Sequence, residues 1–421
     1  YKDDEGVVPD EVLKPLLDKL YNKILNNFTV REREFYDLEF GFFNEVTAIS
    51  GKLKPFIKKS KMEKKLKIDQ EMALIEIKPR VYLRSHPDGT VVDIDRLSGK
   101  PLQSHAKAPF MATFLIRGVA STEKSTTETS TTETSTTETN EGTCTEITSS
   151  TRAPSSNTRW QSAIFKVGDD CRQDVLAIQL INVCKNIWEH YCLDIYVFPY
   201  RVIATNAGCG LIDVLPHSIS RDMLGREAVN GLYEWFVNKF GDENSMDFEI
   251  ARLNFIKSLA GYSVISYLLQ FKDRHNGNIM YDDMGHILHI DFGFIFDIVP
   301  GGVKFEAVPF KLTKEMVKIL GGSKNSKYFL LFEKLCCQAF LQLRWQQEFI
   351  IKCIEPMLDS GLPCFKANKT IKNLKNRFVL GKDDLQAAQY MKHLINKSYE
   401  SVYTKGYDCL LYTSPSPRDC S

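Results

Sequence analysis

The sequence DRHNGN occupies residues 273–278, and after the strand-like HILHI (286–290) it is followed by DFG at 291–293. An Asp and an Asn five positions apart, and then an Asp just past a strand, form the arrangement that kinases use around the transferred phosphoryl group. DFG alone would be weak evidence, but the ordered combination with a strand between its parts is specific. The alternative is that these polar residues only cap a helix and form a turn.

Each polar residue of this stretch has a physical role in phosphoryl transfer. Magnesium prefers hard oxygen ligands, which Asn278 and Asp291 can supply while triphosphate oxygens and waters fill the other positions. Asp273 can orient an attacking hydroxyl and take its proton, and His275 can share that role or contact the γ-phosphate. Phosphates also need a positive partner on a rigid strand, and Lys166 in AIFKV meets that requirement. A lysine in this position of a strand, taken alone, is more often a surface strand lysine.

The surrounding segments predict two lobes of different architecture. SAIFKV (162–167) and GLIDVL (210–215) have the composition of strands, as does the short YVF (196–198). A helix follows GDDCRQD, and apolar residues three or four positions apart predict a long buried helix over 250–268 that ends just before DRHNGN. A strand-rich first half and a helix-rich second half favour an α+β fold.

The N-terminal part has the pattern of an accessory layer of helices followed by strands. Apolar residues at helical spacing from Asp10 to about Val46 predict a helix or a helix pair. Eight lysines stand between residues 52 and 67, opposed only by Glu63, and this run could be a solvated linker or a surface drawn to an anionic membrane. Two or three strands are expected within residues 80–117, where RVYLRS and TVVDID flank the turn signal HPDG.

A low-complexity segment interrupts the strands. Residues 121–158 contain almost no hydrophobic side chains and repeat STTET three times in succession at 125–139. Such a segment cannot bury enough apolar area to offset the entropy lost on ordering, so we expect a disordered surface loop without catalytic chemistry. Its length is tolerated because the entropy of closing a loop grows slowly with length.

The overall composition is that of a soluble globular protein. The 421 residues include 54 Lys and Arg against 53 Asp and Glu, a formal net charge of +1, which argues against a nucleic-acid binder held by bulk phosphate attraction. No apolar run approaches the roughly 18 residues needed to span a bilayer. The 11 cysteines form no CxxC pair, so reduced thiols in a cytosolic protein are expected. Because the first residue is Tyr1, we expect the chain to be a fragment.

Three segments resemble one kinase family. IFKVGDDCRQD (164–174), DRHNGNI (273–279) and DFGF (291–294) are similar to the phosphatidylinositol 3- and 4-kinase superfamily, whereas ordinary protein kinases place the catalytic Asp after HR. With KAPFMATF, FPYRV and GLPCF included, the chain resembles most closely the type III alpha group of phosphatidylinositol 4-kinases, from about residue 35 to about residue 408. The resemblance implies a two-lobed, protein-kinase-like α+β domain with a helical accessory segment at 1–78, a β-rich N-lobe at 79–215 interrupted by the loop at 118–158, a helical C-lobe at 216–408, and a tail at 409–421 that looks foreign to the family.

The resemblance also implies a role for each candidate residue. Asp273 and His275 would serve the attacking inositol hydroxyl, and Asn278 and Asp291 would bind magnesium, which manganese could replace. ATP would be held by Lys166 at the α-phosphate, by Asp174 and Tyr200 in the inner pocket, by the backbone of a phosphate-covering loop at Ser104, Ala106, Lys107 and Ala108, and by the hinge backbone of Asp213, Val214 and Leu215.

The implied activity is transfer of the γ-phosphate of ATP to the 4-hydroxyl of phosphatidylinositol, at the cytosolic face of a membrane and by resemblance the plasma membrane. Residues 291–310 contain one cation, Lys304, against Asp297 and Glu306, too few cations for a headgroup that already carries 4- and 5-phosphates unless accessory residues elsewhere supply the charge. This segment therefore favours unphosphorylated phosphatidylinositol, whereas the choice of the 4-hydroxyl rests on the resemblance alone. Scaffold and membrane-adaptor proteins are expected partners through further N-terminal regions, and nucleic acid is not.

Three other functions remain as alternatives. A phosphatidylinositol 3-kinase belongs to the same class of enzyme and differs in its product isomer. A catalytically silent scaffold would keep the fold, but the intact Lys166, Asp273, Asn278 and Asp291 argue against it. A protein kinase is disfavoured by the order DRH.

A second basic segment lies near the end of the chain. Lys366, Lys369, Lys372, Lys375 and Arg377 occur without an acid between residues 366 and 377. If helical, they form a stripe that could rest on anionic lipid. A solvated helix face explains the same pattern.

Overall fold

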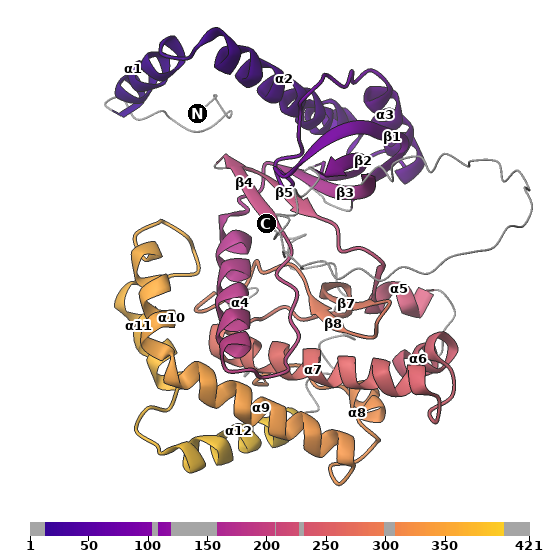
Figure 1. Ribbon diagram of the computed structural model, residues 1–421, viewed down its shortest axis with the longest axis vertical. Helices are drawn as coiled ribbons and strands as arrows, with labels where there is room; N and C mark the ends of the chain where they lie inside the picture. The colour runs from indigo at the N-terminus through magenta and orange to yellow at the C-terminus, as the bar shows by residue number, and fades with distance from the viewer. Residues whose placement is uncertain are drawn as a thin grey trace, which may run out of the picture.

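The computed structural model describes residues 13–102, 108–118, 158–206, 208–226, 231–298 and 308–399. Two hydrophobic cores divide this part of the chain: one lies between a five-stranded sheet and N-terminal helices, and a larger one fills a helical lobe. Figure 1 shows the sheet and its helices above the helical lobe. The predicted two-lobed, protein-kinase-like α+β fold is confirmed.

The sheet of the upper lobe is antiparallel throughout. Its strand order is β1 (Gly89–Pro101), β2 (Phe110–Gly118), β3 (Thr158–Val167), β5 (Cys209–Asp213) and β4 (Val202–Asn206). Alternate residues of β2 are buried, as expected of a strand with one face on the core, and its Phe110 ring stacks on Phe165 of β3. This sheet carries Lys166 at a fixed register opposite Gly210.

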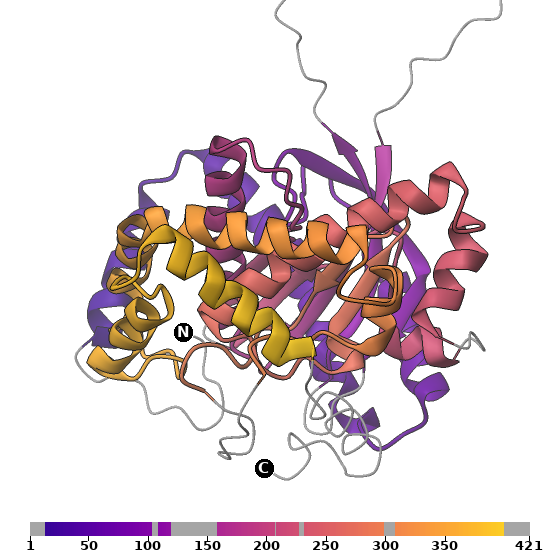
Figure 2. The same cartoon turned by 90° about the horizontal axis from the view of Figure 1, so that it is seen from below.

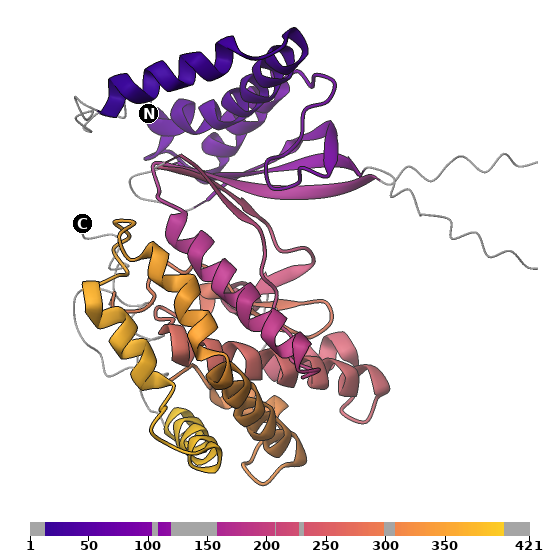
Figure 3. The same ribbon diagram turned by 60° about the vertical axis from the view of Figure 1, so that its left-hand side comes forward.

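The N-terminal part holds three helices (Figure 3). They are α1 (Leu13–Asn26), α2 (Val30–Leu53) and α3 (Lys61–Ala73), with the 3₁₀ turn η1 (Lys54–Phe56) between the last two. Helices α2 and α3 pack on the outer face of the sheet, whereas α1 has no buried residue. Capping boxes at Thr29 and Ser60 start α2 and α3. The predicted helix pair is therefore present.

The lysine-rich run at 52–67 is not a linker, because most of it belongs to α2, η1 and α3. Lys52 and Lys67 both bind Glu71, at 2.5 and 2.7 Å, and Lys65 binds Asp69 at 2.7 Å. The acids that neutralise these lysines follow the run along α3, one helical turn beyond Lys65 and Lys67.

Two predicted strands are absent from the described structure. RVYLRS (80–85) forms an irregular segment that turns at Leu83 and His86, so the described residues between 80 and 117 hold two strands. YVF (196–198) belongs to no strand of the described structure, and the nearby strand that joins the sheet is β4. Its apolar character reflects packing on a helix: a Cβ added to Gly261 would lie 2.8 Å from Val197.

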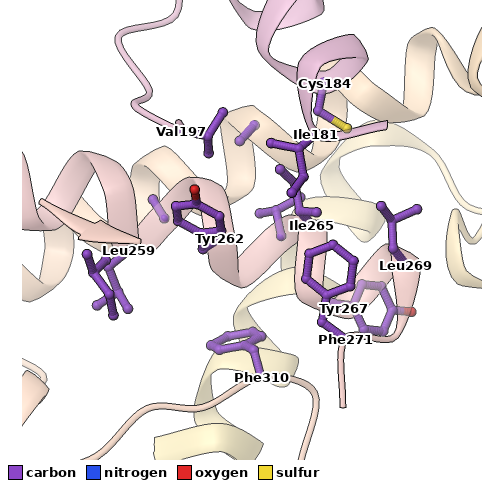
Figure 4. Packing of buried hydrophobic residues seen from close by; sticks show 14 of the residues in the cluster. Ile181, Cys184, Val197, Leu259, Tyr262, Ile265, Tyr267, Leu269, Phe271 and Phe310 are labelled. Atoms are coloured by element: carbon purple, nitrogen blue, oxygen red, sulfur yellow. The ribbon is translucent and has the colours of Figure 1, made fainter. Parts of the chain in front are cut away.

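The lower lobe is built around α7 (Met246–Leu269), and every residue of its last three turns, 258–269, is buried. In Figure 4, Tyr262 and Ile265 of α7 face Ile181 and Val197. Figure 2, a view from below, shows α9 (Lys327–Trp345) and α12 (Asp384–Tyr399) crossing each other beneath α7. The predicted long buried helix before DRHNGN is confirmed. The remaining elements are α4 (Arg172–His190), α5 (Arg221–Arg226), α6 (Leu232–Phe240), α8 (Lys314–Ile319), α10 (Gln347–Ile354), α11 (Ala367–Arg377), η2 (Asn276–Asn278), η4 (Glu355–Met357), and a small sheet of β6 (Ser218–Ser220), β7 (Ile279–Asp282) and β8 (Ile287–His289).

The basic stripe of 366–377 lies on and beside α11, but Arg377 is not part of it. The Arg377 side chain turns inward and donates from Nε to the carbonyl oxygen of Leu268 at 2.7 Å. Burial lowers the pKa of this guanidinium to about 10. Four lysines remain on the exposed face.

Several expectations concern residues outside the described ranges. They are the inserted loop at 119–157, the phosphate-covering residues Ser104, Ala106 and Lys107, the segment around Lys304 and Glu306, and the tail at 409–421. Within the described part, no helix is both long enough and apolar enough to cross a membrane.

Candidate active site

Two loops that carry the predicted acids are joined by one buried arginine. Arg274 donates to the carbonyl oxygens of Lys272 (2.9 Å) and Ile290 (2.7 Å), and also to that of Asp291. The loop after α7 and the loop after β8 therefore meet at this guanidinium. Asp273 and Asp291 both have a φ of 59°, a left-handed backbone conformation that non-glycine residues rarely adopt and that is typical of functional sites.

Asp291 is also tied to the first turn of α4. The backbone N–H of Phe292 donates to Asp174 Oδ1 at 2.8 Å, and Gln173 Nε2 donates to the Phe292 carbonyl oxygen at 2.9 Å. Asp174 and Gln173 are buried at the start of α4, directly after the GDDC turn. The segment that begins with Asp291 is thus fixed to the start of α4 as well as to Arg274.

Lys166 reaches this cluster from β3. Burial lowers the pKa of its ammonium, but the carboxylates of Asp174 and Asp291 raise it more, so the net pKa lies above the ordinary value. The side chain is therefore a permanent cation between two acids. The structure brings together Lys166, Asp174 and Asp291, as the sequence predicted.

The catalytic-loop candidates are held by short local hydrogen bonds. Asn278 Nδ2 donates to the Asp273 carbonyl oxygen at 2.9 Å, and the Ile290 N–H donates to the Asn278 carbonyl oxygen at 3.2 Å. His275 Nδ1 accepts from the Gly277 N–H at 2.9 Å, which caps η2. These contacts tie Asp273, His275 and Asn278 into the loop that follows α7.

The Gly277 contact decides the tautomer of His275. A backbone N–H can only donate, so Nδ1 must carry its lone pair and the proton of the neutral ring is on Nε2. Burial lowers the pKa of His275, although the carboxylate of Asp273 opposes this, so the ring is neutral at pH 7. Of the two roles that the sequence left open, this tautomer favours donation from Nε2 to an anion over abstraction of a proton.

One cation beside this loop was missed from the sequence. Lys311 Nζ donates to Asn276 Oδ1 at 3.0 Å and is close enough to His275 to lower its pKa. Lys311 lies one position beyond the segment 291–310, whose few cations favoured an unphosphorylated headgroup. A search for lysines flanking the segment after DFG would have found it.

The inner pocket and the hinge agree only in part with the prediction. The buried ring of Tyr200 stacks on Phe292, with centroids 6.4 Å apart. The Asp213 N–H donates to the Arg201 carbonyl oxygen (2.9 Å) and the Val214 N–H to that of Ser162 (3.0 Å), so neither is available to adenine. The N–H of Leu215 has no hydrogen-bond partner among the described residues and remains the candidate donor.

The Asp213 side chain serves the upper lobe. Its Oδ2 lies 3.5 Å from Nε2 of His86. Burial raises the pKa of Asp213 to about 6, and burial together with Arg201 lowers the pKa of His86 to about 4. At pH 7 the aspartate is ionised and the histidine is neutral, so this contact is not an ion pair.

Only one residue of the predicted phosphate-covering loop lies within the described ranges. The carbonyl oxygen of Ala108 accepts from Ser50 Oγ of α2 at 2.9 Å. The accessory helix α2 therefore anchors the end of this loop.

Asn278 and Asp291 fit a magnesium ion that is bound mainly through its nucleotide. Because Asn278 Nδ2 donates to the Asp273 carbonyl oxygen, the amide oxygen is fixed as the group that can act as a ligand. No cluster of three or more His, Cys, Asp or Glu side chains that could hold a metal occurs in the described part of the chain. A pair of oxygen ligands suits magnesium, which keeps phosphate oxygens and waters in its other positions.

Comparisons with known proteins give a consistent result. A family model described as phosphatidylinositol 3- and 4-kinase matches residues 160–367. The chain is 63% identical over 408 residues to phosphatidylinositol 4-kinase STT4 of Saccharomyces cerevisiae, covering 97% of this chain and 20% of that protein. It is 58% identical to stt4 of Schizosaccharomyces pombe, covering 97% and 21%, and 37% identical to phosphatidylinositol 4-kinase alpha 2 of Arabidopsis thaliana, covering 94% and 68%. The chain thus spans about a fifth of the length of the two yeast proteins.

Proposed function

Because the chain belongs to the phosphatidylinositol 3- and 4-kinase family, we propose that it transfers the γ-phosphate of ATP to the 4-hydroxyl of phosphatidylinositol. The observation that carries the proposal is the convergence of Lys166, Asp174 and Asp291 with the loop of Asp273, His275 and Asn278 around Arg274. The 4-hydroxyl is chosen because the similar proteins are named phosphatidylinositol 4-kinases.

ATP would lie between the lobes. The N–H of Leu215 would bind the adenine edge, and Tyr200 and Asp174 would close the inner end of the pocket. Lys166 would meet the α-phosphate, and the Asp174 carboxylate keeps this lysine charged despite its burial. The backbone of the loop that ends at Ala108 would cover the phosphates, with Ser104, Ala106 and Lys107 as the proposed contacts.

Asn278 and Asp291 would hold magnesium, or manganese in its place. When bound, the metal neutralises charge on the β- and γ-phosphate oxygens. Asp273 would orient the inositol hydroxyl and accept its proton, since its backbone is fixed by Asn278. His275 would donate from Nε2 to the γ-phosphate.

The substrate would be unphosphorylated phosphatidylinositol. Lys311 adds one cation to Lys304 on the segment that follows Asp291. Two cations still fall short of the roughly 3 to 4 negative charges that 4- and 5-phosphates would add to the headgroup. The lipid implies peripheral attachment at the cytosolic face of a membrane, the plasma membrane by resemblance, and scaffold and adaptor proteins would bind regions outside this chain.

One assay tests the proposal. The full-length protein is incubated with labelled ATP, magnesium and phosphatidylinositol, and the deacylated product is identified by chromatography. The 4-phosphate is expected. A 3-phosphate product would contradict the choice of hydroxyl, and phosphorylated peptide without lipid product would contradict the substrate class.

A further inference from the structure

Helix α11 presents an unpaired basic face at the edge of the helical lobe, where Figure 1 shows it beside α10. Lys366, Lys369, Lys372 and Lys375 are exposed, and none forms an ion pair with any residue that the structure describes. The opposite face is buried through Thr370, Leu374 and Phe378. A helix with one apolar face in the protein and one face of a single charge sign outside suits contact with an extended anionic surface.

Two side chains of α11, the buried Thr370 and the exposed Asn373, bind the segment that begins with Asp291. Thr370 Oγ1 donates to Asp297 Oδ2 at 2.5 Å, and Asn373 Nδ2 donates to Asp297 Oδ1 at 3.0 Å. Thr370 Oγ1 in turn accepts from the Lys366 N–H at 2.9 Å. Both oxygens of one carboxylate are therefore engaged by one helix, and we call these three side chains the α11 latch.

The α11 latch adjoins the catalytic loop. Lys272, which precedes Asp273, donates from Nζ to the carbonyl oxygens of Phe296 (2.5 Å) and Ile298 (2.8 Å), on either side of Asp297. Its backbone N–H donates to the Phe294 carbonyl oxygen at 3.0 Å. A displacement of α11 that pulls on Asp297 therefore moves a segment joined both to Asp291 and to the loop of Asp273.

We propose that α11 docks on anionic lipid and that the α11 latch transmits this docking to the segment Asp291–Ile298, raising lipid turnover at the membrane. The proposal rests on the lipid kinase function proposed above. A lipid surface is favoured over an acidic protein or RNA because the substrate itself lies in that surface, and α11 is joined directly to the segment that must face it.

The two parts of the proposal differ in their physics and can be separated. Docking by lysines is electrostatic and weakens with salt, and each lysine near an anionic surface contributes roughly fivefold in binding. The latch uses neutral donors at close range, so it persists in salt. Changes in the lysines should therefore alter vesicle binding. Changes in the latch should alter only the stimulation of lipid turnover that follows binding.

The test uses the full-length protein and vesicles containing 5% phosphatidylinositol, with or without 20% phosphatidylserine. Docking is removed in Lys369→Gln/Lys372→Gln/Lys375→Gln and the latch in Thr370→Val/Asn373→Ala. Thr370→Ser keeps the hydroxyl and tests rescue. Lys314→Gln/Lys327→Gln/Lys334→Gln removes three exposed lysines of α8 and α9 as a charge-matched control. Vesicle sedimentation and lipid turnover are measured, with turnover on detergent-dispersed phosphatidylinositol as reference.

We expect phosphatidylserine to raise turnover by the wild type severalfold. The α11 lysine variant should lose at least tenfold in vesicle binding, whereas the control variant should lose less than threefold. The latch variant should bind vesicles like the wild type but lose the stimulation by phosphatidylserine, and Thr370→Ser should retain it. Equal binding by the two lysine variants would overturn docking through α11.

Undiminished stimulation in the latch variant would overturn the coupling. A wild type that makes no lipid product in detergent or in vesicles would instead overturn the proposed function, and sedimentation would still decide whether α11 docks. Preferential binding of an acidic protein or RNA by the α11 face, with no loss of vesicle binding in its lysine variant, would reject the lipid surface as partner.

Discussion

His275 offers a substitution pair that separates a hydrogen-bond donor from a general base. The ring has one fixed contact, the Gly277 N–H at Nδ1, and one functional nitrogen, Nε2. In His275→Gln the side-chain amide can place an N–H near the position of Nε2 but cannot keep the contact with Gly277. In His275→Asn the amide oxygen can accept from Gly277, but no donor reaches the position of Nε2.

The two roles predict different magnitudes. A hydrogen bond to a charged phosphate oxygen contributes about 1.5 to 3 kcal/mol, so its loss in His275→Asn should cost roughly 10- to 150-fold in kcat/KM. His275→Gln should lower kcat/KM by about tenfold or less. This loss corresponds to the missing η2 cap, about 1 kcal/mol, and to the imperfect placement of the Gln amide N–H. A general base contributes about 10²- to 10⁴-fold, and neither amide can replace it.

The assay is lipid turnover against pH for the wild type and both variants, with thermal unfolding as a control for folding. The ring can donate a hydrogen bond from Nε2 in both its neutral and its protonated form. If His275 is a donor, the low-pH limb of the wild-type profile of lipid turnover against pH should therefore persist in His275→Gln. A base would lose activity as the pH falls through its pKa, which burial holds below the ordinary value. Equal losses above 100-fold in both variants, together with disappearance of the acid limb, would refute the donor role.

Three further predictions follow from particular contacts. Lys166→Met and Asp291→Asn should each lower lipid turnover more than 100-fold without loss of folding, and near-normal rates in either would contradict the assignment. Gly261→Ala should destabilise the protein by about 1–3 kcal/mol in denaturant unfolding, since the new Cβ would lie 2.8 Å from Ile195 and Val197; Gly41→Ala, in α2 with no atom within 4 Å, should be neutral or stabilising by about 0.5–1 kcal/mol. Asp213→Asn should raise stability at pH 7 by about 1–2 kcal/mol and leave it unchanged near pH 4. The reason is that a carboxyl with a raised pKa stabilises the fold below its unfolded-state pKa and loses this contribution as the pH rises through 6. An equal gain in stability at both pH values would count against this assignment.

Local sequence signals predicted much of this structure. The 3.6-residue period located α7 and α4, and the motifs beside these helices anticipated that Asp291 would lie near Lys166 and near the loop of Asp273. Such signals work because hydrophobic period and turn chemistry are local properties of the chain. The roles of these residues remain predictions.

Other features depend on contacts that no local pattern reveals. YVF is apolar because it lies on Gly261 of α7, and composition cannot distinguish this burial from that of a strand. Arg377 belongs to a lysine-rich run yet turns inward, because the Leu268 carbonyl oxygen at the end of α7 needs a donor. The Thr370–Asp297 contact joins residues 73 positions apart, and their spacing in sequence carries no sign of it.

The hydrogen bonds that Arg274 donates to Lys272, Ile290 and Asp291 all go to carbonyl oxygens, and its guanidinium also lies over the Phe292 ring. Every residue type has a carbonyl oxygen, so point substitutions at positions 272, 290 and 291 leave the partners of this guanidinium chemically intact. A lysine at 274 would offer one small ammonium in place of a planar fork and could not span both loops in the same way. Mutational tolerance should therefore be asymmetric, with position 274 close to invariant among active variants and its partner at 290 free to vary in side chain.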